Sequence, residues 1–116
     1  MEPKIVSIKS IVLHLPYPKS RTVYIEVDIN GSMGKTGKRK SEKGSFVFLD
    51  EMMLFKHKLV YEGKLNVYEI NEGIPCFVGS GSMGLFSDRT ERKVMIMDKN
   101  RSIGEAYVEG VLFNTD

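Results

Sequence analysis

Apolar and polar positions alternate along much of the chain, and the clearest case is residues 22–29. There Val23, Ile25 and Val27 are separated by single residues that are polar or aromatic, such as Glu26. A period of two places successive side chains on opposite faces, so this run predicts a strand with one buried and one solvated face.

Comparable apolar runs recur along the rest of the chain, and Gly, Asn, Asp or Ser separates most of them: residues 4–15, 46–49, 54–61, 65–70, 94–97 and 106–113. Many short strands with turn residues between them predict an all-β sandwich or barrel. In the first run the apolar positions change parity between Ile8 and Ile11, and a β-bulge near Ser10 would reconcile them. Residues 36–40 are expected to form a short strand, and residues 72–87 two loops around another.

A chain of 116 residues is long enough for one hydrophobic core, so we expect a single domain over residues 1–116. Cys76 is the single cysteine, and no apolar stretch approaches the roughly 20 residues of a spanning helix. The first residues lack a secretory pattern. We therefore expect a cytoplasmic protein without a transmembrane segment, with any membrane contact being peripheral.

Charge is concentrated in one place. Residues 35–43, called the basic segment below, carry five basic side chains and one acidic one, a local charge of +4 within a net charge of +2. The remainder of the chain therefore sums to −2. Clustered charge of one sign indicates an anionic partner, although a short run of lysines also occurs on solvated strand edges.

Residues 79–84, Gly-Ser-Gly-Ser-Met-Gly, match the glycine pattern of dinucleotide-binding sites, and Asp98 follows at a fitting distance. That motif requires a helix beginning at its third glycine. Here the turn-forming residues 85–88 follow, and too few residues remain for a doubly wound sheet. The pattern therefore does not predict a nicotinamide or flavin site.

Gly34, Lys35 and Thr36 resemble the end of a P-loop. The glycine that should begin the phosphate cradle is replaced by Ile29, whose branched side chain blocks a close approach of the backbone to phosphate. We reject a nucleoside triphosphatase on this ground.

Metal and nucleophile patterns are also missing from the sequence. His14, His57 and Cys76 have no metal-binding spacing and are interpreted as packing residues. No Ser, Thr or Cys stands in a recognisable nucleophile motif. The chain is therefore expected not to be an enzyme and to need no cofactor.

The order of these elements resembles that of a C2 domain over nearly the whole chain. The resemblance is carried by five segments: residues 23–27, 35–38, 44–51, 64–69 and 103–108. It implies an eight-stranded antiparallel β-sandwich that binds lipid or protein.

Calcium-binding C2 domains place several acids in two facing loops, because calcium requires converging carboxylate oxygens. Residues 16–20 contain no acid, and Lys19 and Arg21 stand where an aspartate is expected. Glu69, Asn71 and Glu72 in the other loop are weak metal candidates. The resemblance thus implies a member without tight calcium binding, in which a basic side chain supplies the positive charge.

The resulting interpretation is a calcium-independent module that targets membranes through anionic phospholipid or phosphoinositide. The candidate lipid-binding residues are all basic: Lys35, Lys38, Arg39, Lys40, Lys43, Lys56 and Lys58. The candidates for loop insertion into the membrane are Tyr17, Lys19, Arg21 and Phe77.

Two alternatives use the same features. A protein-interaction or scaffolding module with neither lipid nor calcium binding would also explain the loop without acids. Nucleic acid is disfavoured, because no aromatic residues alternate with the basic side chains to stack on bases.

Overall fold

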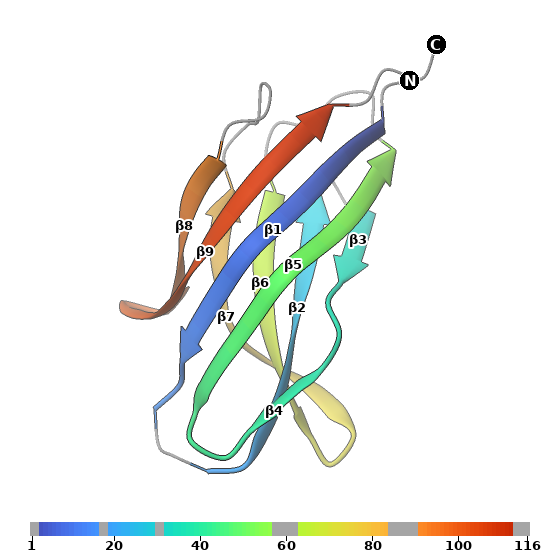
Figure 1. Ribbon diagram of the computed structural model, residues 1–116. Coiled ribbons are helices and arrows are strands. Elements are labelled where there is room, and N and C mark those ends of the chain that lie inside the picture. The colour runs from blue at the N-terminus through green and yellow to red at the C-terminus, as the bar shows by residue number, and fades with distance from the viewer. Residues whose placement is uncertain (1–2, 17–18, 30–31, 57–62, 84–90, 113–116) are drawn as a thin grey trace.

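The computed structural model describes residues 3–16, 19–29, 32–56, 63–83 and 91–112, and these residues form antiparallel strands joined by short connections. The strands, in chain order, are β1 (Pro3–His14), β2 (Arg21–Ile29), β3 (Ser32–Lys35), β4 (Arg39–Ser41), β5 (Ser45–Lys56), β6 (Gly63–Asn71), β7 (Ile74–Met83), β8 (Glu91–Asp98) and β9 (Arg101–Leu112) (Figure 1).

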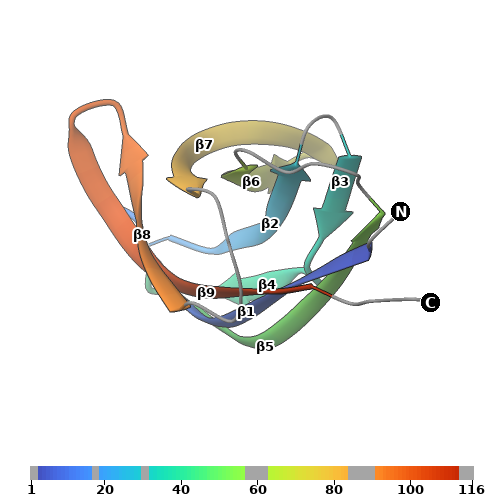
Figure 2. The same ribbon diagram turned by 90° about the horizontal axis from the view of Figure 1, so that it is seen from above.

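Eight strands follow one hydrogen-bonded path in the order β3-β2-β6-β7-β8-β9-β1-β5, and the short β4 pairs with β2 beside β3. Strands β7 and β8 share one registered pair, Ser80 with Met97. The sheet therefore turns at this junction, and its two halves face each other as layers (Figure 2). This arrangement confirms the predicted all-β antiparallel sandwich.

The space between the layers is filled by apolar side chains from β1, β2, β5, β6, β8 and β9. Val23, Ile25 and Val27 are fully buried, as the alternation along residues 22–29 predicts. They pack in one cluster with buried residues of the facing layer, including Ile11 and Phe48. The core therefore lies midway between the layers and leaves both outer faces and the turns for contacts with partners.

The predicted irregularity in the first strand is present. The register of β1 against β9 shifts between Ile8 and Ser10, and Ile8 and Ile11 are both fully buried although three residues apart. On β5, the neighbouring strand that pairs with β1, Asp50 has a positive φ of 53°. A bulge at this level changes the parity of both strands. It joins the run 46–49 and the beginning of the run 54–61 into one strand, β5, which ends at Lys56; His57 lies outside the described residues.

The prediction of two loops within residues 72–87 is wrong over the part that the structure describes, because residues 74–83 form β7. Gly79 and Gly81 occupy its inward positions. A Cβ atom on Gly79 would lie 2.6 Å from the carbonyl oxygen of Met97, and one on Gly81 2.7 Å from that of Met95. Only glycine allows so close an approach to the backbone of β8, so the buried face of β7 lacks the apolar signal of a strand.

The short strand expected at residues 36–40 is also placed incorrectly. Two strands, β3 and β4, lie on either side of Thr36 and pair with different parts of β2. Thr36 is buried, and its hydroxyl accepts a hydrogen bond from the amide of Ile25 at 3.0 Å. This side chain fixes the link between β3 and β4, and with it the basic segment, against the sheet.

Candidate functional site

Three connections lie together at one end of the sandwich, which we call the loop end: the described residues 15–16 and 19–20 between β1 and β2, residues 72–73 between β6 and β7, and residues 42–44 between β4 and β5 (Figure 1). The amide of Leu15 donates to the carbonyl of Gly44 at 2.8 Å, which ties the first connection to the third. Val23 on β2 pairs with Glu69 near the end of β6.

The lysines of the basic segment lie along β3, β4 and the turn that leads into β5, on or near this end. Lys35 closes β3, Lys38 lies between β3 and β4, Lys40 belongs to β4, and Lys43 lies in the turn before β5; all four are exposed. Lys19, in the first connection, is exposed as well. The fold thus gathers five cationic side chains on or near the loop end.

A hollow of about 230 Å³ lies between the basic segment and the β6–β7 turn. Its lining combines two lysines with aromatic, aliphatic and small residues: Tyr24, Lys35, Thr36, Lys38, Ile70, Gly73 and Pro75. The Lys35 ammonium lies 5.7 Å from the centroid of the Tyr24 ring. Cations beside an open hollow can receive a phosphate group, and the ring gives its wall an apolar face.

Aromatic rings continue from this hollow across the outer face of the layer. Tyr24 and Tyr68 stack with centroids 5.4 Å apart, and Phe77 meets Tyr68 edge-on at 5.9 Å. Burial raises the pKa of Tyr68, and the nearby Glu26 raises that pKa further. The phenol therefore stays neutral at physiological pH. Phe77 and Ile74 remain 60% and 65% exposed, so this face offers apolar surface next to the lysines.

Arg39 differs from the lysines in its contacts. Its guanidinium lies over the Phe48 ring, 5.6 Å from the centroid, and 3.7 Å from a carboxylate oxygen of Glu51. Both partners belong to β5, so Arg39 connects β4 in one layer to β5 in the other. We therefore assign this arginine to the joining of the layers and do not count it among the cations available to a ligand.

Arg21 is buried at the start of β2 and does not project toward a membrane. It donates to the carbonyl of Pro16, and its Nε lies 3.8 Å from a carboxylate oxygen of Glu69. The guanidinium thus joins the first connection to the end of β6. This contact corrects the expectation that Arg21 is a loop residue for membrane insertion, and it is consistent with a basic side chain supplying positive charge at this end.

The three weak metal candidates differ in burial and in their contacts. Glu69 is buried beside Arg21, whereas Asn71 and Glu72 are exposed. Among the described residues, no three His, Cys, Asp or Glu side chains lie close enough to hold a metal ion.

We expect calorimetric titration with calcium to detect no site tighter than roughly millimolar, because Glu69, the buried carboxylate at this end, already faces a guanidinium. A micromolar site would contradict this assignment. A parallel titration with the Arg21→Ala variant would then show whether Glu69 is able to bind calcium once its partner is removed.

Three further candidates are not assigned to the site. Lys56 is the last residue of β5, and a strand of 12 residues is about 40 Å long. It therefore lies at the far end of the molecule from β4 (Figure 1), and we leave it out of the site. Lys58 and Tyr17 lie outside the described residues.

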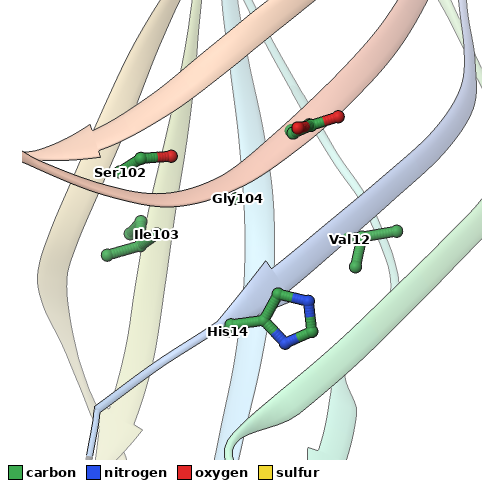
Figure 3. Close-up of a pocket in the computed structure, with 6 residues that line it drawn as sticks. Val12, His14, Ser102, Ile103 and Gly104 are labelled. Atoms are coloured by element: carbon green, nitrogen blue, oxygen red, sulfur yellow. The ribbon is translucent and has the colours of Figure 1, made fainter.

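A second hollow, of about 370 Å³, opens between β1 and β9, on the layer opposite the basic segment (Figure 3). His14 is exposed there, with its Nδ1 3.2 Å from the Ser45 hydroxyl. Glu105, which also lines the hollow, lies 3.5 Å from the Lys93 ammonium. His14 is thus an exposed side chain on the outer surface, so its interpretation as a packing residue is not confirmed.

Comparison with protein-family models and with curated proteins finds no match. Solved structures do match over almost the full chain. One titled as the structure of a C2 domain superposes with a TM-score of 0.69 at 14% identity, covering 97% of this chain and 99% of the other. The chain has the C2 domain fold.

Two further C2 domains support this assignment. A C2 domain-containing protein from a putative elicitor-responsive gene gives a TM-score of 0.70 at 11% identity, covering 100% of this chain and 90% of the other. A C2 domain of plant Extended Synaptotagmin 1 gives 0.62 at 12% identity, covering 98% and 95%. At such identities the likeness concerns the fold, and the ligand must be argued from this chain's own side chains. Across the described ranges, no helix is long and apolar enough to cross a membrane.

Proposed function

We propose that this C2 fold is a membrane-targeting module whose loop end docks on anionic phospholipid or phosphoinositide without calcium. The observation that carries the proposal is the hollow in which Lys35 and Lys38 lie beside Tyr24. Headgroup phosphates would lie between these ammonium groups, while Lys40, Lys43 and Lys19 face the surrounding lipid surface.

Two features of the loop end support docking without a metal. Calcium in a C2 domain adds positive charge between acidic loops, whereas here the buried Arg21 lies between the first connection and Glu69. In addition, the exposed Ile74 and Phe77 offer apolar surface that is able to enter the interfacial region of the bilayer. The loop end therefore supplies both cations and apolar contact from its own side chains.

The expected strength follows from the number of cations. Each lysine near an anionic leaflet contributes about 1 kcal/mol, so the four lysines of the basic segment give about 4 kcal/mol, equivalent to a dissociation constant near 1 mM. Apolar insertion adds to this value. Attachment by one such domain is therefore weak, and it depends strongly on salt because exposed charges are screened.

Sedimentation with vesicles tests the proposal. With a calcium chelator present, the protein should sediment with phosphatidylcholine vesicles that contain phosphatidylserine or a phosphoinositide, and it should be released as ionic strength rises from about 0.05 M to about 0.5 M. Pure phosphatidylcholine vesicles are the control. Binding that needs calcium, or that is equal on neutral vesicles, would contradict the proposal; absence of binding to all anionic vesicles at low salt would favour a protein-interaction module.

A further inference from the structure

The outer edge of β5, in the second layer, offers a binding surface that differs from the proposed lipid site. β5 is the last strand of the sheet path, and among the described strands only β1 pairs with it. The other side of such a strand presents backbone N–H and C=O groups that can pair with an added strand.

The part of this edge that suits pairing is residues 45–49. The positive φ of Asp50 interrupts the regular strand directly after it. Within these residues Phe46 and Phe48 point into the core, while Val47 and Leu49 are 53% and 60% exposed on the outer face. An added strand would therefore find apolar side chains on its outer side at alternate positions.

Charge indicates the chemistry of the partner. The basic segment leads directly into β5, with Lys40 and Lys43 exposed. Contacts of Arg39 with Phe48 and Glu51 hold β4 beside the inner side of β5. A second copy of this chain would bring two segments of charge +4 together, which opposes pairing of identical edges. A partner strand with carboxylates on its inner side matches the local charge.

We infer that residues 45–49 of β5 bind an extended acidic peptide as an added antiparallel strand. Alternate apolar side chains of the peptide lie against Val47 and Leu49, and the intervening carboxylates lie toward the basic segment, whose Lys43 directly precedes β5. The peptide's backbone supplies the hydrogen bonds, so alternation of apolar and acidic residues is the feature that the site recognises.

The probe is an acetylated and amidated peptide of about nine residues in which glutamate alternates with valine. Its binding to the whole ¹⁵N-labelled chain is followed by amide chemical shifts and hydrogen exchange. We expect shifts and added protection within residues 45–49. N-methylation of alternate peptide residues keeps the charge of the peptide but removes the backbone N–H donors along one of its edges. It should weaken binding about tenfold.

Paired variants separate strand addition from simple charge attraction. Val47→Thr with Leu49→Thr should lower the affinity for the peptide about fivefold, because threonine keeps the strand propensity at both positions but removes the apolar contact. Met33→Thr, at an exposed position on β3, is the matched control and should leave affinity unchanged. Val47→Thr with Leu49→Thr should also keep full vesicle binding, so this inference can fail without affecting the proposed function.

Several results would overturn the inference. These are absence of peptide binding, equal affinity of the N-methylated peptide, shifts on β3 in place of β5, or an affinity that falls on lysine removal but is unchanged in the variant with Val47→Thr and Leu49→Thr. Equal binding by the N-methylated form would identify plain electrostatic attraction to the basic segment.

Discussion

Replacement of Lys38, Lys40 and Lys43 together by alanine is expected to reduce binding to anionic vesicles by about 100-fold. Three lysines at about 1 kcal/mol each account for about 3 kcal/mol, and each 1.4 kcal/mol is a factor of ten. The three side chains are exposed, so stability should change by less than about 0.5 kcal/mol. Vesicle sedimentation at low salt and thermal unfolding measure the two effects.

Two controls make this result interpretable. Lys64→Ala with Lys93→Ala removes two exposed charges from strands outside the loop end and should leave vesicle binding nearly intact. Arg39→Ala should lower the free energy of unfolding by about 1 kcal/mol, because it removes the contacts with Phe48 and Glu51. Arg39 is therefore kept in the lysine variant. Undiminished binding by the triple variant would exclude these lysines as the docking surface.

The second large effect is expected from Glu69→Ala, which should lower the free energy of unfolding by about 3 kcal/mol. The side chains of Arg21 and Glu69 are only 7% and 12% exposed. Removal of the carboxylate leaves a buried guanidinium without its acidic partner, and such losses typically cost 3–5 kcal/mol. The separation of 3.8 Å favours the lower value. Urea denaturation measures the change.

The double variant Arg21→Met with Glu69→Leu is the matched control for this pair. Apolar residues of similar volume often replace a buried ion pair at little cost, so the double variant should be more stable than Glu69→Ala alone. A change below about 0.5 kcal/mol in Glu69→Ala would mean that solvent screens the pair, as at an exposed site.

Local alternation along the sequence predicts much of the fold because the apolar residues of a half-buried strand report which side faces the core. The buried Val23, Ile25 and Val27 follow that rule, and the parity change between Ile8 and Ile11 predicts the bulge. β7 is not predicted, because it lacks apolar residues at its inward positions. Its inward positions must be glycine to accommodate the backbone of β8, and glycine carries no apolar signal.

The residues of the candidate site can be predicted only where their role follows from the neighbouring residues in the sequence. The concentration of charge in residues 35–43 is visible in the sequence, and the exposure of Lys38 and Lys40 agrees with it. The roles of Arg21 and Arg39 depend on strands that are distant in sequence: Glu69 lies on β6 and Phe48 on β5. Composition does not distinguish an arginine that joins two strands from an arginine that is available to bind a ligand.

The strand order also bears on when this sandwich can form during synthesis. β9 lies between β8 and β1 in the sheet, so β1, the first described strand, lacks one of its two neighbours until β9, the last described strand, has left the ribosome. Until then β1 is able to pair with β5 alone. Nascent chains that lack β9 expose the edges of β8 and β1 in addition to the free edge of β5, and such unpaired edges favour misassociation.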